Sequence, residues 1–205
     1  MMEFESRASL KSSESLEYLN LNVKYEPTII TKNMNQERLV LYEGLEREIG
    51  NTPLYENSKI KLPRENRVFA KEENKNPGGS HYDRVFIALF KHYEESGEII
   101  PGYTPVVETT SGSAGVSFAR LGRILGYECL VVCPENLPTN RLNAISEEGA
   151  NLRLTPGKKY VNGSAEELGR IFKVENKERK TRGKVPYFGL NHTQGEAADI
   201  SANSV

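Results

Sequence analysis

The hydrophobic pattern alternates, from residue 67 onward, between short apolar runs and longer stretches with helical spacing. Short runs rich in β-branched and aromatic residues predict strands at 67–73, 104–110, 127–135, 150–156 and 185–191. Apolar residues at intervals of three and four predict helices at 81–97, 111–126, 138–149 and 164–180. A strand followed by a helix, four times in succession, is typical of an α/β protein, with a parallel sheet and helices on both faces.

Local signals refine these elements. The strand at 127–135 is a continuous apolar run, as expected of a parallel strand buried on both faces. Ser164 and Glu167 have the spacing of a capping box, which predicts that the last helix begins there. In parallel sheets, ligands bind at the carboxyl ends of the strands, in the turns that lead into helices. Two Gly-rich turns, at 76–80 and 109–115, occupy such positions.

The residues before this alternation have a different character. Residues 36–49 carry apolar side chains at helical spacing and are followed by a turn and a short extended segment. Residues 1–35 are predicted to form an N-terminal extension, disordered over 1–15, with an edge strand at 23–31. Residues 36–205 then make up the folded domain.

Composition narrows the function classes. The 205 residues include 27 Lys and Arg against 28 Asp and Glu, so the net charge is −1 and no basic field favours nucleic acid or an anionic membrane. No apolar run is long enough to span a membrane, and the N-terminus lacks a signal-peptide core. We therefore expect a soluble, cytoplasmic protein.

Cysteine and histidine positions give no metal signal. Cys129 and Cys133 lie four apart on a predicted strand, so they share a face but are too far apart to bridge. We interpret them as small buried hydrophobic residues, with a metal or redox pair as the alternative. The three histidines lack ligand spacing, so no metal site is expected.

The turn "TTSGSAG", residues 109–115, is the first candidate site. It connects a predicted strand to a predicted helix, and the free N–H groups of a helix start, with Ser and Thr hydroxyls beside them, form an anion pocket. A carboxylate or a phosphate would fit there. The alternative is a simple Ser-capped helix start with glycines for packing.

The turn "NPGGSHYDR", residues 76–84, is the second candidate site. Asn-Pro-Gly-Gly is a turn signal, Ser80 can cap the following helix, and Asp83 supports its first turn. These roles give a complete structural account of the segment.

Taken together, the two turns resemble the cysteine synthase-like, fold type II (tryptophan synthase β-like) enzymes that use pyridoxal 5′-phosphate. The resemblance runs from about residue 38 to residue 190. It rests on four motifs in order: "IGNTPL" at 49–54, "KEENKNPGGSHYDR" at 71–84, "ETTSGSAGVSFA" at 108–119 and "VVCPENLPTNRLNAISEEGANL" at 131–152. It implies an α/β domain, a pyridoxal phosphate cofactor, and β-elimination or β-replacement on serine or O-acetylserine.

The resemblance also assigns residue roles. Asn76, Ser80 and Ser113 would contact the cofactor, and the loop after the strand would hold the substrate carboxylate. That loop comprises Thr110, Ser111, Gly112 and Ser113.

The chain departs from the family at three points. Tyr82 stands where the family has its Schiff-base lysine, and a phenol cannot condense with the cofactor aldehyde. Ser113 replaces the usual asparagine. The sequence given ends at Val205, before the family's Gly-rich phosphate loop, so we expect an incomplete domain that a second polypeptide could complete.

Three readings stay open. The chain could be an enzyme, a catalytically silent relative that binds an amino acid or a partner, or a fragment of a longer protein. Its expected ligand is a small amino acid, and its expected protein partner is either a second copy or a completing chain.

Overall fold

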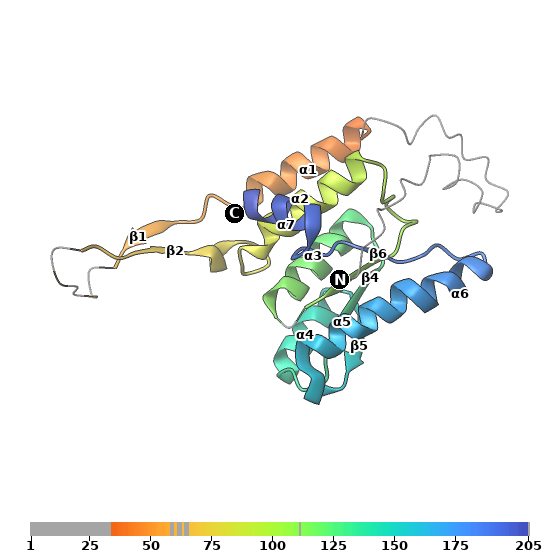
Figure 1. The fold of residues 1–205 in the computed structure, drawn as a ribbon. Coiled ribbons are helices and arrows are strands. Elements are labelled where there is room, and N and C mark those ends of the chain that lie inside the picture. Colours follow the sequence, from red (N-terminus) through yellow and green to blue (C-terminus); the bar gives the residue numbers. More distant parts are fainter. Residues whose placement is uncertain (1–33, 58–59, 61–62, 64–65, 111, 205) are drawn as a thin grey trace.

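A parallel sheet with helices on both faces forms the body of the molecule (Figure 1). The structure is a computed structural model that describes residues 34–57, 60, 63, 66–110 and 112–204. The sequence-based expectations for 1–33, including the strand at 23–31, lie outside these residues. None of the described helices is long and apolar enough to cross a membrane.

The sheet has four parallel strands in the order β5-β4-β3-β6. Their bounds are β3 Val106–Thr109, β4 Cys129–Pro134, β5 Asn151–Thr155 and β6 Phe188–Gly189. In register, Val106 of β3 lies opposite Cys129 of β4 on one side and Phe188 of β6 on the other. The predicted α/β class and parallel sheet are confirmed, although β6 is much shorter than the 185–191 run.

Alternate residues of the central strands serve two hydrophobic cores. Val106 and Val131 face a large core that includes Phe86, Phe90 and Phe118 from the helices on one face. On the other face, their sequence neighbours Val107, Leu130 and Val132 pack against the last long helical stretch, which contributes Leu168 and Ile171. This alternation follows from the period of two along a strand.

The large core is covered by α1 Gln36–Glu48, α2 Tyr82–Glu95, α3 Ser113–Leu125 and α4 Thr139–Glu147. The short α7, Gly195–Asn203, packs on α2.

A Cβ on Gly122 would lie 2.1 Å from the Cys129 sulfur, so the glycine allows α3 to lie close against β4. Burial raises the pKa of Cys129 to about 12. Both described cysteines are buried and free, as predicted.

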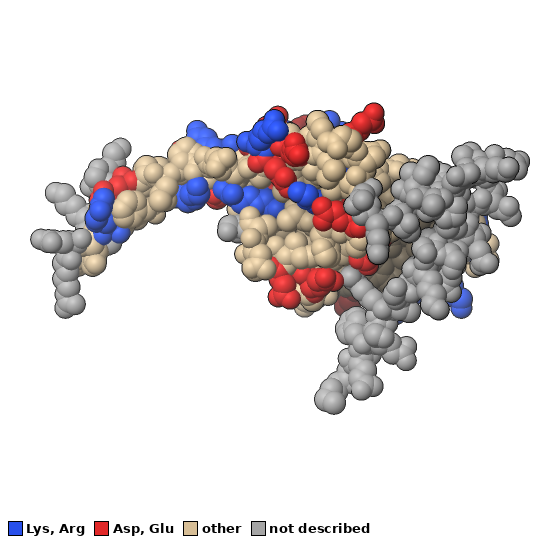
Figure 2. All heavy atoms as spheres, turned by 90° about the horizontal axis from the view of Figure 1, so that it is seen from above, with Lys and Arg blue, Asp and Glu red and all other residues tan. Residues whose placement is uncertain are grey.

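The strand predicted at 67–73 does not join the parallel sheet. Its ordered part, β2 Phe69–Lys71, pairs antiparallel with β1 Leu54–Glu56 in a separate two-stranded sheet. The physical reason is that β2 pairs with the strand just before it in the chain, and an antiparallel return to that strand needs no crossover helix. The two strands project from the body as an arm, clearest in a view from above (Figure 2).

The predicted capping box at Ser164 is wrong. The helix α5 begins at Tyr160 and ends at Arg170, so Ser164 lies within its second turn. The Ser164 hydroxyl is 3.2 Å from the Thr155 hydroxyl at the end of β5, so the partner of this buried side chain is the strand and not the first turn of α5. The helical stretch then continues through a π-helical segment, Ile171–Glu175, into α6 Asn176–Thr181.

Candidate functional site

A cleft of about 420 Å³ opens at the carboxyl ends of the parallel strands. The end of β3, the start of α3, the start of α5 and the loop after β6 form its walls, and Tyr82 of α2 joins them. The lining residues are Tyr82, Thr109, Thr110, Gly112, Ser113, Ala114, Pro134, Val161, Asn162, Ser164, Ala165, His192, Thr193 and Gln194. The cleft therefore contains several of the residues that the sequence singles out.

The start of α3 offers backbone donors to this cleft. Gly112 is its N-cap residue, and a glycine has no side chain that could cap the helix. The Gly112 N–H donates to the Thr110 hydroxyl at 3.3 Å, which fixes the Thr110 side chain at the cleft wall. The first turn of a helix leaves N–H groups without intrahelical partners, and these attract anions. The predicted Ser111 contact lies outside the described residues.

A cation lies close to the same loop. Arg141 comes from α4, and its Nη1 would be 3.5 Å from a Cβ at Gly112. Gly115 lets the two helices approach, because a Cβ there would lie 2.7 Å from the Thr110 methyl group and 2.8 Å from Ile145. The loop geometry and the local charge both suit a carboxylate.

A buried carboxylate positions the opposite wall. Glu108 is 1% exposed, and its Oε2 accepts a hydrogen bond from the His192 N–H at 3.2 Å. The His192 Nδ1 lies 3.4 Å from the same oxygen, without hydrogen-bond geometry. Glu108 Oε1 accepts from the Thr109 N–H at 2.8 Å. Glu108 thus connects the end of β3 to the loop after β6.

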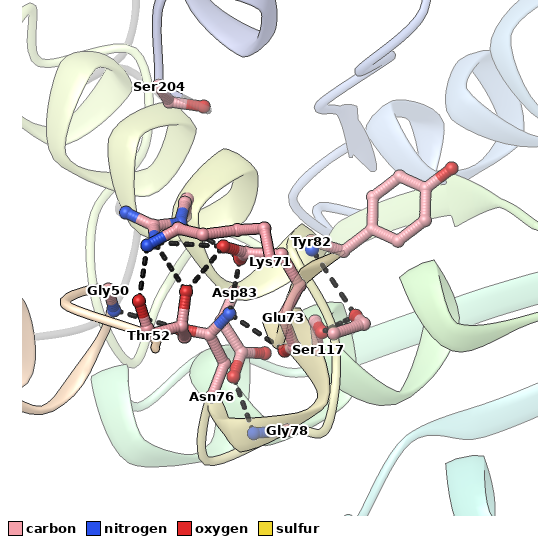
Figure 3. A network of polar contacts seen from close by, with 12 residues as sticks. Gly50, Thr52, Lys71, Glu73, Asn76, Gly78, Tyr82, Asp83, Ser117 and Ser204 are labelled. Carbon is pink, nitrogen blue, oxygen red and sulfur yellow. Dashed lines mark hydrogen bonds and ion pairs between the residues drawn. The ribbon is translucent and has the colours of Figure 1, made fainter. Parts of the chain in front are cut away.

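Tyr82 stands between the two turns. It is the first residue of α2, and its N–H donates to the Ser80 hydroxyl at 3.2 Å. Its ring lies 4.2 Å from the His81 ring and meets the His192 ring edge-on at 5.6 Å. Figure 3 shows the phenol pointing away from the polar network beneath α2. This side chain therefore faces the cleft.

Asn76 and Ser80 do not line the cleft. Asn76 is buried, accepts from the Gly50 N–H at 2.8 Å and donates to Glu73 Oε2 at 2.7 Å (Figure 3). The Ser80 hydroxyl is 3.3 Å from the Ser117 hydroxyl. Both residues hold the turn before α2 in place, and their predicted cofactor contacts stay predictions.

The polar network in Figure 3 centres on Glu73. Arg84 donates to its carboxylate at 3.0 and 3.1 Å, and the Thr52 hydroxyl donates at 2.6 Å. The Arg84 hydrogen bond lowers the pKa of Glu73 most, partial burial opposes this, and Thr52 and Asn76 lower it further, to about 2. The network fixes the root of the arm to α2.

Sequence reasoning missed the wall that follows β6. His192, Thr193 and Gln194 line the cleft, and so do Asn162 and Ser164 at the start of α5. The signal was available for the first group: "NHTQG" follows a parallel strand, at the same edge as the two Gly-rich turns. No spacing rule would have found Asn162, which the fold brings in from the start of α5.

Comparison with known proteins decides the family. The sequence model described as "Pyridoxal-phosphate dependent enzyme" matches residues 45–188. The chain belongs to this family. A cysteine synthase from Staphylococcus aureus is 36% identical over 116 residues, which cover 57% of this chain and 37% of the relative. A cystathionine beta-synthase from Saccharomyces cerevisiae is 32% identical over 129 residues, 62% of this chain and 25% of the relative.

Solved structures of the family agree with the fold. Cysteine synthase from Entamoeba histolytica is 29% identical, with a TM-score of 0.61 over 78% of this chain and 47% of that one. A hydrogen sulfide-producing enzyme from Fusobacterium nucleatum is 28% identical, with a TM-score of 0.63 over 77% of this chain and 44% of that one. The chain thus spans less than half the length of these relatives.

The family's cofactor is pyridoxal phosphate, and the cleft does not fit its covalent attachment. No lysine is present among the residues that line the cleft. Lys71 lines a different cleft, at the root of the arm, where its ammonium group donates to the Thr52 carbonyl. Tyr82, which does line the cleft, has no amine to condense with the aldehyde.

Proposed function

We propose that this chain binds a small amino acid through its carboxylate and does not catalyse β-replacement on its own. The observation that carries the proposal is the cleft itself. Its wall contains the start of α3, whose N-cap residue is Gly112, and the phenol of Tyr82, but no lysine. The similarity to cysteine synthases supports serine or O-acetylserine as the ligand class.

The chain's own residues supply the binding groups. The first N–H groups of α3 and the Thr110 hydroxyl face the carboxylate, and Arg141 adds positive charge nearby. The loop held by Glu108 closes the opposite side with His192 and Gln194. Without an amine at position 82, the site has no group that can hold the cofactor aldehyde or exchange a proton as a lysine does.

The test is calorimetric titration of the purified chain with L-serine and O-acetyl-L-serine. We expect binding that Thr110→Val weakens by about tenfold, because one hydrogen bond to a charged group is lost. Thr181→Val, an exposed position on α6, is the matched control and should leave the affinity unchanged. Equal affinities in wild type and Thr110→Val would refute carboxylate binding at this loop.

Covalent attachment is tested separately. The chain is mixed with pyridoxal phosphate, reduced with borohydride and mapped by peptide mass spectrometry. We expect only scattered, substoichiometric labelling of surface lysines. A stoichiometric adduct at one lysine, with a spectral change on adding O-acetylserine, would overturn the non-catalytic interpretation and favour an autonomous enzyme.

A further inference from the structure

A second cleft, of about 250 Å³, lies around the end of the long helical stretch that α5 begins. Four of its six lining residues are cations, so we refer to it as the arginine cleft. The lining residues are Arg170, Glu175, Glu178, Arg179, Arg182 and Lys184. The cleft with Tyr82 meets the start of α5 and the arginine cleft meets the end of α6, so no residue lines both.

The way α6 ends shapes the arginine cleft. Gly183 has a φ of +67°, in the left-handed region that a glycine adopts without strain. The Gly183 N–H donates to the Lys180 carbonyl at 3.0 Å, and the Lys184 N–H donates to the Arg179 carbonyl at 2.8 Å. These two bonds form a Schellman motif, which turns the chain back at the end of the helix. The motif therefore returns Lys184 to the level of Arg179.

Arg179 is oriented by groups of the protein itself. Its Nε donates to the Val185 carbonyl at 2.7 Å, and its guanidinium carbon lies 4.2 Å from the centre of the Tyr187 ring. Asn176 fixes Tyr187 in turn, because its amide accepts from the Tyr187 N–H at 2.8 Å and donates to the Tyr187 carbonyl at 2.9 Å. The two terminal nitrogens of Arg179 make no hydrogen bond to any residue that the structure describes. They form a preorganised fork of donors.

The other three cations differ in how they are paired. Arg170 donates to Glu167 at 2.7 and 2.9 Å and to Glu175 at 3.1 Å, which orients it at the cleft wall. The side chains of Arg182 and Lys184 have no hydrogen bond or ion pair within the described part of the chain. The carbonyls at the end of α6 already accept backbone N–H groups, so these two side chains are not occupied in capping the helix.

Two carboxylates reduce the positive charge of the arginine cleft without removing it. Glu175 also accepts from Arg153 at 2.6 and 3.2 Å, and this hydrogen bonding lowers its pKa, so it stays ionised. Glu178 has no side-chain partner among the described residues. Four cations against two carboxylates leave a surplus of two positive charges in the wall.

This surplus matches a phosphate monoester, which carries a charge of about −1.5 to −2 near pH 7 and three strong acceptor oxygens. Guanidinium forks also suit the geometry of phosphate. We propose that the arginine cleft binds a phosphate monoester, to which Arg179, Arg182 and Lys184 donate. The volume of about 250 Å³ accommodates the phosphate and a small group attached to it. The inference does not rest on amino-acid binding, because it uses no residue that lines the cleft with Tyr82.

The experiment is calorimetric titration of the full chain with glycerol 3-phosphate at constant ionic strength. A monoester can belong to a small metabolite or to a phosphorylated protein, so a short peptide that contains one phosphoserine is titrated in parallel. Tighter binding of the peptide would identify the second source. Acetate, with a single charge, and glycerol, with none, are the control ligands. We expect acetate to bind at least tenfold more weakly than glycerol 3-phosphate, and glycerol not to bind.

Substitutions in the wall locate the binding. Arg182→Ala and Lys184→Ala, both at exposed positions, should each weaken glycerol 3-phosphate binding by about tenfold, because one hydrogen bond to a charged group is lost. Glu178→Gln should strengthen it by about threefold, because the change removes a like charge from the wall. Lys158→Ala removes the same charge at an exposed position that does not line the cleft, and it should leave the affinity unchanged.

Three outcomes would overturn the proposal. Equal weakening by Lys158→Ala and Arg182→Ala would show a response to overall charge and not to this cleft. Acetate binding as tight as glycerol 3-phosphate binding would exclude recognition of phosphate, and failure of both monoesters to bind would exclude the site. Arg182→Ala should bind L-serine as the wild type does. A wild type that binds glycerol 3-phosphate but not L-serine would reject the proposed function and leave the phosphate site standing.

Discussion

Tyr82 determines the chemistry available to the cleft. It occupies the first position of α2, beside both Gly-rich turns, and its ring contacts His192 from a distant part of the chain. Tyr82 lines the cleft, so the identity of the residue at this position affects the cleft's chemistry and not merely the surface. A phenol at this position has no amine that could condense with an aldehyde.

The substitution Tyr82→Lys tests this directly. We expect the variant to give a borohydride-fixed pyridoxyl adduct at position 82 when excess pyridoxal phosphate is added, because the cleft then contains an amine. The wild type should give no adduct at that position. Peptide mass spectrometry provides the comparison, and Lys71, outside the cleft, is the internal reference. Equal labelling of Lys71 and position 82 in the variant would argue against a specific site.

Glu108 provides a second test at the residue scale. Its buried carboxylate accepts from the backbone N–H groups of Thr109 and His192. Glu108→Ala leaves both donors without this partner, so we expect the free energy of unfolding to fall by about 3 kcal/mol. Urea denaturation measures the loss. A change below about 0.5 kcal/mol, the usual effect of a neutral surface substitution, would contradict a positioning role.

At the scale of elements, the turn between β2 and α2 matters most. It anchors the arm through Glu73 and also sets the start of the helix that carries Tyr82. A Cβ on Gly78 would lie 2.2 Å from Asp83 Oδ1, so the glycine lets the turn close onto the helix. The arm and the cleft therefore depend on one polar network.

The stability of this network should depend on acid pH. The pKa of Glu73 is about 2 in the folded chain, against the ordinary value of 4.5. A depressed pKa means that the stabilisation is complete above about pH 4.5 and is lost as the pH falls towards 2. Urea midpoints of wild type and Glu73→Gln, measured from pH 6 to 2.5, should therefore converge in acid. A difference that stays constant with pH would show that ionisation of Glu73 is not the cause.

At the scale of the whole molecule, the cleft lies where the carboxyl end of β3, the starts of α3 and α5 and the loop after β6 meet. A ligand that bridges these elements should stabilise the whole domain. At a concentration tenfold above its dissociation constant, L-serine should raise the free energy of unfolding by about 1.4 kcal/mol. Thermal unfolding with and without L-serine measures this, with D-serine as the control. No stabilisation at saturation would show that binding is not coupled to the fold.

The sequence by itself determined the fold class, the parallel strands, the helix starts at the Gly-rich turns and the absence of an amine at position 82. These follow from periods of two and 3.6, from turn chemistry and from residue identity, all of which are local. Tertiary structure decided that β2 leaves the parallel sheet, because strand pairing depends on which strand the folded chain brings alongside, here β1. It also decided that Ser164 pairs with Thr155 inside a helix, and that His192 joins Tyr82 in the cleft. Contacts between different elements leave no periodic trace in the sequence, so only the folded chain brings these residues together.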